Sequence, residues 1–216
     1  MNFFTKGQQL IWDQFKKDEF LRSTFYFTGG TALTLIYLHH RESEDLDFFS
    51  EQPFDTQITL DKVSLWSEKF NIKVKSRSIE KVQMFDFTFP DEERLKIDFN
   101  HYPYKRMEKG KNVEKVIVDS LLDIAINKLL TTNQRTEVKD FVDLYFLLQE
   151  FTVWTLMDGV KVKFRVELEP VIVGGDFLKI EEFDTLPKML VPLSLKKLQN
   201  FYREQAKRLG MHTVKK

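Results

Sequence analysis

The stretch FTGGTALTLIYLHHRESEDLDFF, residues 27–49, decides the fold of this chain. It starts with apolar residues, passes through a glycine pair and a run of helix formers, and ends in an acidic link before two phenylalanines. The pattern predicts a strand, a glycine turn, a buried helix from Thr31 to about His39, and a second strand. Asp45 and Asp47 lie directly beside that second strand's apolar residues, so they are either solvated or hold cations.

On either side of this stretch, the spacing of apolar residues changes between helix and strand periods. Residues 7–22 predict one opening helix, and residues 59–70 predict another. Apolar and polar residues then alternate in three segments, NIKVKSRSI, VQMFDFTF and RLKIDFNHY, which span 71–79, 82–89 and 94–102. Alternation predicts three strands of an antiparallel or mixed sheet with one covered face.

From residue 118 onward helical spacing returns. VDSLLDIAINKLL and TEVKDFVDLYFLLQEF predict two helices, and SLKKLQNFYREQAKRLG predicts a last helix that stops at Gly210. GVKVKFRVEL, residues 159–168, is typical of a strand or an irregular segment. The expected fold class is α+β: a mixed sheet flanked by helices in residues 1–117, then a mostly helical lobe in residues 118–216.

The overall composition excludes several classes of protein. The chain of 216 residues has 33 basic and 33 acidic residues, so its net charge predicts no avid attraction to nucleic acid or membrane. It has no cysteine, which excludes disulfides, thiolate metal sites and cysteine nucleophiles. The sequence has no secretion signal and no apolar run long enough for membrane insertion, so we expect no membrane association and a cytoplasmic location.

Three aspartates are expected on one face of the sheet. Side chains two residues apart on a strand point to the same side, so Asp45 and Asp47 face away from the core together. In RLKIDFN the apolar residues alternate with polar ones, and Asp98 also faces away from the core. If these two strands pair, the three carboxylates converge.

Such a convergence predicts bound metal. Three close carboxylates repel each other unless a cation neutralises them. Carboxylate oxygens suit Mg²⁺ or Mn²⁺, and two such ions can clamp the reacting oxygens of a phosphoryl transfer. The turn formed by Gly29, Gly30 and Thr31 adds backbone N–H groups and a hydroxyl at a helix start, which favours a bound phosphate.

Each of these features also has an ordinary structural explanation. A glycine pair before a helix is commonly a tight turn, an acidic link is commonly solvated, and one aspartate on a strand is commonly a surface residue. Their combination in this order is harder to explain by structure alone.

The combination resembles the nucleotidyltransferase fold of DNA polymerase beta, in which Gly-Gly or Gly-Ser, a helix, Asp-x-Asp and a later third carboxylate follow one another. More specifically, GGTALTLIYLHHRESEDLDFF together with KDFVDLYFLL, residues 139–148, is similar to the abortive-infection nucleotidyltransferase toxins of the AbiEii/AbiGii type. The similarity covers most of the chain.

The resemblance implies a role for each matching position. Gly29, Gly30 and Thr31 would hold the triphosphate of a nucleotide. Asp45, Asp47 and Asp98 would be catalytic and metal-binding residues, with Asp98 placed to accept the proton of an attacking hydroxyl. Thr31 replaces the serine of many polymerase-like enzymes and keeps the hydroxyl.

The resemblance also extends to the helical lobe. Lys128 would contact phosphate, Lys139 would assist nucleotide binding, and Asp140 and Asp143 would be catalytic. A scaffold explanation remains open there, because Lys139 and Asp143 have the spacing of an ion pair on one helix face. His40 and Arg41 belong to the matched stretch and either anchor the connection or touch phosphate.

The resemblance implies a metal-dependent enzyme that moves NMP from an NTP to an acceptor hydroxyl. The acceptor would be RNA, such as the end of a tRNA, and the protein would be the toxin of a toxin–antitoxin or phage abortive-infection system with a cognate antitoxin. An alternative is an idle module of the same fold that binds RNA or a protein partner. A metal-dependent phosphohydrolase is a third hypothesis, but the sequence lacks the histidine cluster that would favour it.

Overall fold

The computed structural model describes residues 4–80 and 82–214, which form two compact units. The sheet unit contains the chain up to Tyr37, then Ser43–Lys105 and Lys109–Ser120. The helical unit contains Leu38–Glu42, Arg106–Glu108 and the chain from Leu121 onward. Two short segments therefore leave the sheet unit and return to it before the chain enters the helical unit for good.

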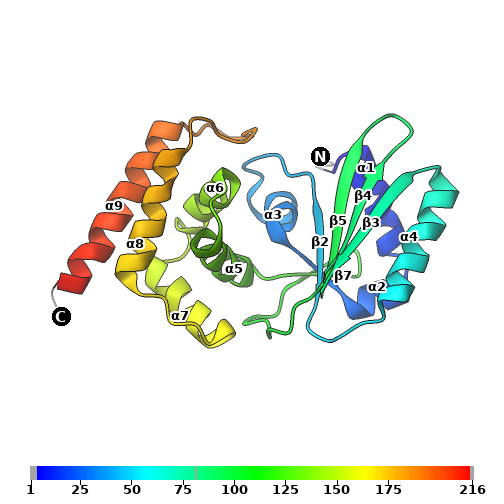
Figure 1. The fold of residues 1–216 in the computed structure, drawn as a ribbon, viewed down its shortest axis with the longest axis horizontal. Coiled ribbons are helices and arrows are strands. Elements are labelled where there is room, and N and C mark those ends of the chain that lie inside the picture. The colour runs from blue at the N-terminus through cyan, green and yellow to red at the C-terminus, as the bar shows by residue number, and fades with distance from the viewer. Residues whose placement is uncertain (1–3, 81, 215–216) are drawn as a thin grey trace. The chain divides into compact units, whose positions relative to one another are not determined.

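The sheet unit is built from seven strands and a small set of helices (Figure 1). Its strands are β1 (Tyr26–Thr28), β2 (Leu46–Ser50), β3 (Lys73–Ile79), β4 (Val82–Thr88), β5 (Arg94–His101), β6 (Lys111–Val113) and β7 (Val116–Val118). Its helices are α1 (Lys6–Phe15), α2 (Glu19–Thr24), α3 (Gly29–Ala32), the π-helical η1 (Leu33–Leu38) and α4 (Thr56–Phe70).

The strands form one mixed sheet in the order β3-β4-β5-β2-β1-β7-β6. The β2–β5 and β1–β7 pairs are parallel, and the other pairs are antiparallel. In Figure 1, α1, α2 and α4 lie along one face of this sheet and α3 lies on the other. The predicted mixed sheet flanked by helices, and with it the α+β fold class, is confirmed.

Aromatic packing fixes which face of the sheet is the core. Phe48 of β2 stacks on Phe15 of α1 with ring centroids 4.0 Å apart, and on Phe99 of β5 at 5.4 Å. All three rings are fully buried. Because side chains alternate along a strand, burying Phe48 here places Asp47 and Phe49 on the opposite face.

The single opening helix predicted over residues 7–22 is wrong, because the chain forms α1 and α2 instead. Asp18 has an extended backbone, and its carboxylate accepts a hydrogen bond from the Leu21 N–H at 3.1 Å. This cap starts a new helix, and Lys16 and Lys17 form the turn that separates it from α1. The apolar spacing continues across the break, which is why the sequence suggested one helix.

The helix after the glycine turn begins earlier than predicted and changes its form. It starts at Gly29 rather than at Thr31, and its second part, η1, is π-helical. His39 follows with a left-handed backbone, φ 50°, and ends the helix. Single π turns inside helices are often found at functional sites.

The helical unit contains α5 (Leu121–Gln134), α6 (Val138–Leu147), α7 (Val153–Phe164), α8 (Pro170–Leu178), the short 3₁₀ helix η2 (Lys179–Glu182) and α9 (Leu195–Val214). In Figure 1, α8 and α9 lie side by side. Tyr202 of α9 packs against Phe177 of α8 and donates a hydrogen bond to the Phe141 carbonyl at 2.7 Å. None of the helices in the described part of the chain is long and apolar enough to span a bilayer.

Two predictions for the helical unit are wrong. Residues 159–164, expected as strand or irregular, belong to α7, in which Leu156 and Val160 are fully buried at helical spacing. α7 starts at a Thr152 cap and ends where Arg165 takes a left-handed backbone. The last helix does not stop at Gly210 but continues to Val214, because that glycine keeps an ordinary helical backbone.

Candidate functional site

The parallel pairing of β2 with β5 brings two of the predicted carboxylates together. Asp47 lies directly opposite Asp98 in the register, and both side chains project from the face that the aromatic core does not occupy. Asp45 immediately precedes β2 and is close enough to Asp98 to influence its charge. The strand pairing on which the three-carboxylate prediction depended is therefore present.

The glycine turn lies against one of these carboxylates. A Cβ atom at Gly29 would lie 2.1 Å from Asp47 Oδ2, and Gly29 has φ +76°. Only glycine satisfies both conditions, because a larger residue would be strained and would displace the carboxylate. The start of α3 and the second aspartate thus form one compact corner of the sheet.

A lysine that the sequence analysis did not identify lies among the carboxylates. Lys96 Nζ is 2.6 Å from Asp98 Oδ2. Burial works to lower the pKa of Lys96, but the negative charges of Asp98, Asp45 and Asp47 outweigh it and raise that pKa. The signal was available, because Lys96 precedes Asp98 by two residues on the same strand and must share its face.

Asp98 has a raised pKa and one carboxylate oxygen without a hydrogen-bond donor in the described structure. Burial, with a contribution from Asp45, raises the pKa of Asp98 despite the Lys96 ammonium. Its second carboxylate oxygen, Oδ1, is buried and accepts no hydrogen bond within the described structure. A buried acceptor without a donor is costly, and a cation or a proton would satisfy it.

The carboxylates are not arranged as a complete set of metal ligands. Within residues 4–80 and 82–214, no three His, Asp or Glu side chains are arranged to hold one ion. Lys96 provides positive charge at this face instead. The donor types nevertheless fit a hard divalent cation, because Asp47 and Asp98 offer carboxylate oxygens on one face, Asp45 lies near Asp98, and Asp98 Oδ1 has no donor among the described residues.

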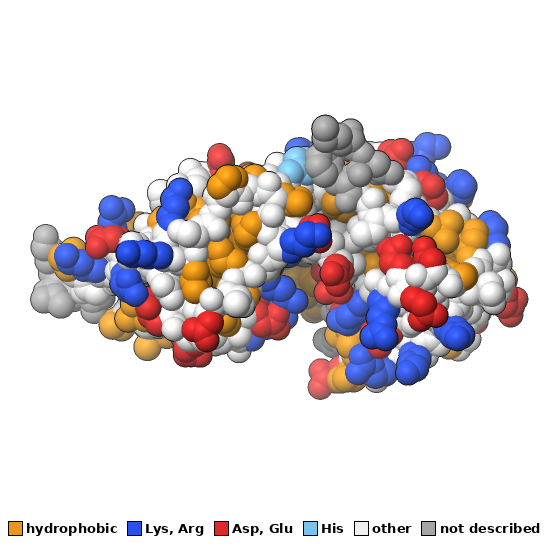
Figure 2. Space-filling view, turned by 90° about the horizontal axis from the view of Figure 1, so that it is seen from above, with side chains coloured by type: hydrophobic (Ala, Val, Ile, Leu, Met, Phe, Trp, Pro, Cys, Tyr) orange, Lys and Arg blue, Asp and Glu red, His pale blue; other side chains and the backbone are white. Residues whose placement is uncertain are grey.

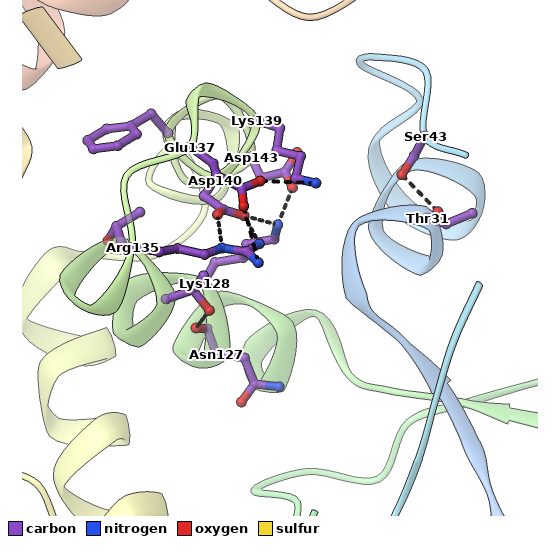
Figure 3. Close-up of polar contacts among 12 residues, drawn as sticks. Thr31, Ser43, Asn127, Lys128, Arg135, Glu137, Lys139, Asp140 and Asp143 are labelled. Carbon is purple, nitrogen blue, oxygen red and sulfur yellow. Dashed lines mark hydrogen bonds and ion pairs between the residues drawn. The ribbon is translucent and has the colours of Figure 1, made fainter. Parts of the chain in front are cut away.

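The predicted phosphate-binding turn is also held from within the sheet unit. Thr31 is fully buried, and its hydroxyl and that of Ser43 are hydrogen-bonded at 2.7 Å (Figure 3). Gln8 donates to the carbonyls of Ser43 and Glu44. These bonds anchor the acidic link to the start of the helix and so position the residues just before β2.

The helical-lobe candidates form a separate buried ion cluster inside the helical unit (Figure 3). Lys128 Nζ of α5 lies 2.7 Å from Asp140 Oδ1 and 2.6 Å from Asp143 Oδ2 on α6. Arg135 adds a second cation, 2.8 Å from Asp140 Oδ2. The structure therefore brings Lys128, Asp140 and Asp143 together. The two aspartates lie on the face of α6 that is directed at α5, and Lys128 reaches them from α5.

His40 and Arg41 complete this cluster from a distant part of the sequence. Arg41 donates to both oxygens of Asp143 at 2.6 and 2.8 Å, and His40 Nε2 lies 2.8 Å from Asp143 Oδ1. The interpretation that His40 and Arg41 anchor the connection is confirmed. The suggested ion pair between Lys139 and Asp143 is wrong: Lys139 pairs with Glu137 at 3.0 Å, while Asp143 is held by buried cations.

Ion pairing keeps Lys128 and Asp143 of this cluster in their charged forms. Burial works to raise the pKa of Asp143, but Lys128, Arg41 and His40 outweigh it and hold that pKa well below its usual range. Burial likewise works to lower the pKa of Lys128, and the two aspartates keep it raised. Lys128, Asp140 and Asp143 therefore stay charged at neutral pH, while His40 Nδ1 is a buried polar atom of the cluster without a hydrogen-bond partner in the described structure.

One face of the molecule (Figure 2) has charged side chains of both signs and no broad patch of either sign. On the face drawn in Figure 2, lysine and arginine side chains are interspersed with aspartates and glutamates. This distribution agrees with the balanced composition of 33 basic and 33 acidic residues. Binding of any polyanion must therefore depend on a local arrangement of cations.

Comparison with known proteins gives a family, a relative and similar folds. The family model described as Nucleotidyl transferase AbiEii toxin, Type IV TA system, matches residues 11–213. An uncharacterized protein of Aquifex aeolicus (strain VF5), aq_aa25, is 34% identical over 155 residues, which are 65% of this chain and 66% of that protein. This chain thus matches slightly less than two thirds of that relative's length.

Among solved structures, JHP933 from Helicobacter pylori aligns with a TM-score of 0.58 and 20% identity. The alignment covers 96% of this chain and 91% of JHP933. A second H. pylori crystal structure aligns at the same TM-score over 98% of both chains. At this level of identity the likeness shows a shared fold.

Proposed function

The chain belongs to the AbiEii nucleotidyl transferase toxin family, and from this premise we propose that it moves NMP from an NTP to an acceptor hydroxyl, as the toxin of a type IV toxin–antitoxin system. One observation carries the proposal: Asp47 lies opposite Asp98 in the β2–β5 register, and Gly29 touches the Asp47 carboxylate. A phosphate-binding turn next to paired carboxylates is the arrangement that this transfer needs.

The reaction forms a bond between the acceptor oxygen and the α-phosphorus, and breaks the bond from that phosphorus to the pyrophosphate. In our proposal Asp98 accepts the proton of the acceptor hydroxyl. The position of its Oδ1 atom suits that task, because this oxygen accepts no hydrogen bond within the described residues. The backbone N–H groups of Gly29 and Gly30, with Thr31, hold the phosphates in line.

A divalent cation fits the carboxylates, and Asp45, Asp47 and Asp98 would hold it. Mg²⁺ or Mn²⁺ bound there would neutralise charge on the transferring phosphate and orient it. Lys128, Lys139, Asp140 and Asp143 stay predicted site residues. For Lys128, Asp140 and Asp143, the support is a rigid network that keeps one lysine charged and fixed.

We further propose that the acceptor is RNA and that a cognate antitoxin restrains the protein. The family description supports the antitoxin, because it places the family in a type IV toxin–antitoxin system. The acceptor can be identified by incubating the protein with each α-labelled NTP, Mg²⁺ and total RNA. We expect label in RNA and release of pyrophosphate.

The matched variants are Asp47→Asn, which removes a charge at the site, and Asp61→Asn, which removes one from an exposed position on α4. Asp47→Asn should abolish transfer and Asp61→Asn should leave it unchanged. NTP binding without transfer by the unmodified protein would identify an idle module. Release of free phosphate would identify a phosphohydrolase, and label on polypeptide would exclude an RNA acceptor.

The toxin role is tested separately by inducing the protein in a bacterial host. We expect growth arrest with the unmodified chain and normal growth with Asp47→Asn at the same protein level. Equal arrest with both chains would show that toxicity does not depend on transfer.

A further inference from the structure

A cavity of about 560 Å³ in the sheet unit opens over β3, β4 and β5 and reaches the carboxylates, because Asp45 is part of its lining. Lys73, Lys75, Arg94 and Lys96 also line it. The strand registers explain why these side chains meet. Lys73 pairs with Thr88 and Thr88 with Arg94, while Lys75 pairs with Asp86 and Asp86 with Lys96. All of them project from the polar face of the sheet.

Three of these four cations are available to a ligand. Lys96 is paired with Asp98. Lys73, Lys75 and Arg94 are exposed and have no ion-pair partner within the described part of the chain. Asp86, an acid in the same lining, is partly neutralised by Arg77 at 3.1 Å. The lining thus has four cations against three acids, Glu44, Asp45 and Asp86, which is an excess of one positive charge in a chain whose net charge is zero.

The position of the cavity separates it from the phosphate-binding turn. In the strand order, Asp98 and Asp47 lie on β5 and β2, the cavity lies over β5, β4 and β3 on one side, and the Gly29 turn follows β1 on the other. The carboxylates stand between two places suited to anions. A transfer reaction needs two such places, one for the triphosphate and one for the acceptor.

An alternative explanation for the lysines is protection of a sheet edge. β3 is the edge strand, and lysines on an edge discourage pairing with another chain. Arg94 does not lie on that edge strand, because it is on β5, two strands inward, where it pairs with Thr88 of β4 and precedes the residues that pair with β2. The convergence of an inner-strand arginine with edge lysines favours a ligand.

We propose that this cavity binds the backbone phosphates of the acceptor RNA and directs its terminal hydroxyl toward Asp98, an inference that rests on the proposed function. Lys73, Lys75 and Arg94 supply the charges. Phe87 belongs to the lining but is 1% exposed, so among the described lining residues there is no aromatic ring available for base stacking. Recognition therefore depends on phosphates and is tolerant of sequence.

The test compares the triple variant Lys73→Gln, Lys75→Gln, Arg94→Gln with a control triple, Lys6→Gln, Lys17→Gln, Lys69→Gln. The control removes the same charge from exposed positions in and beside α1 and α4, on the other side of the sheet. Fluorescence anisotropy measures the Kd for a labelled, mixed-sequence single-stranded RNA over a range of salt. A labelled NTP analogue with Mg²⁺ is titrated in parallel.

Each phosphate contact with a single strand contributes about 0.7 to the slope of log Kd against log salt. Loss of three contacts should lower that slope by about 2, which weakens binding roughly a hundredfold near 0.1 M salt and has no effect near 1 M. The control triple should keep the slope of the unmodified protein. NTP binding should be equal in all three proteins.

The outcomes separate this inference from the proposed function. If the cavity triple binds and labels RNA as well as the unmodified protein, the cavity assignment is wrong and the transferase proposal stands. If the cavity triple loses NTP binding together with RNA binding, the assignment is wrong, because the cavity then serves the nucleotide. If the unmodified protein labels a polypeptide and not RNA, both the RNA acceptor and the proposed RNA-binding role of the cavity are excluded.

Discussion

At the scale of single residues, the candidate site depends on close contacts that leave no room for substitution. Gly29 touches Asp47 and takes a backbone conformation that L-residues rarely adopt. Asp98 has a buried oxygen without a donor, and Lys96 supplies the nearest positive charge. The chemistry proposed for this face therefore depends on Gly29 and on the charges of Asp45, Asp47, Asp98 and Lys96.

Gly29→Ala should damage both stability and transfer. The positive φ costs a residue with a Cβ about 1–2 kcal/mol, and the new atom would displace Asp47, so the transfer rate should fall roughly a hundredfold. Denaturant unfolding and the label-transfer assay measure the two effects. Gly175→Ala is the control: nothing lies within 4 Å of its Cβ, and a gain of about 0.5–1 kcal/mol is expected in α8. Normal transfer by Gly29→Ala would contradict this account of the turn.

Lys96→Gln should bind Mn²⁺ more tightly than the unmodified protein. The positive charge of Lys96 lies a few ångströms from the carboxylates and repels a metal ion bound there. Removing it removes a repulsion of about 1 kcal/mol, so the Kd for Mn²⁺ should fall roughly fivefold. Free Mn²⁺ in a titration can be followed by electron paramagnetic resonance, with Lys17→Gln as the control. Weaker Mn²⁺ binding would instead mean that Lys96 holds the carboxylates in the binding arrangement.

Alternation along the strands was sufficient to predict that Asp47 and Asp98 share a face. It could not single out Lys96, because the same rule applies to every polar residue of a strand. It also could not pair Arg41 with Asp143, since 102 residues separate them and no local period connects them. The residues missed are those whose partners come from tertiary structure.

At the scale of elements, the strands of the sheet were predictable and α7 was not. VQMFDFTF and RLKIDFNHY each have one buried face, so period two is unambiguous there. In α7, alternating valine and lysine imitates a strand, while burial follows the helical positions Leu156 and Val160. Gly159 permits this packing, because a Cβ there would lie 2.4 Å from Ile126 Cδ1 of α5.

The α5–α7 contact is tested by a double-mutant cycle on Gly159 and Ile126. Ile126→Ala alone should cost about 2–5 kcal/mol through the cavity that it leaves. In the presence of Gly159→Ala the added methyl occupies part of that space, so the double variant should lose less than the sum of the single changes. Gly210→Ala in α9 is the control, because no described atom outside its own helical turn lies within 4 Å of a Cβ at this position. Strict additivity in denaturant unfolding would show that the two helices do not touch at this point.

At the scale of the whole molecule, the two units are interleaved in the sequence. Leu38–Glu42 and Arg106–Glu108 belong to the helical unit although they interrupt the sheet unit. A simple split into lobes of residues 1–117 and 118–216 stays a prediction about folding domains. Apolar periodicity could suggest such a split, but it could not assign the short interrupting segments, which have no period.

The buried aspartates should make stability depend on pH. The pKa values of Asp140 and Asp143 are lowered in the folded chain, so their contribution is complete above the ordinary aspartate pKa of about 3.9 and is lost as pH falls below it. The free energy of unfolding, measured in denaturant from neutral to acid pH, should decline most steeply below that value. Asp140→Asn should flatten this decline, whereas Asp91→Asn on an exposed turn should not. An unchanged slope in Asp140→Asn would assign acid sensitivity to other groups.

The clamp of His40 and Arg41 on Asp143 also has a consequence for synthesis of the chain. The ribosome makes these two residues about a hundred positions before their partner. At about 5–20 residues per second, roughly 5–20 s pass before Asp143 is made. During that interval the nascent chain carries the histidine and the guanidinium in water, and the helical unit cannot close around them. Folding of the helical unit is therefore completed late in synthesis, and the rate of translation sets the earliest time at which it can occur.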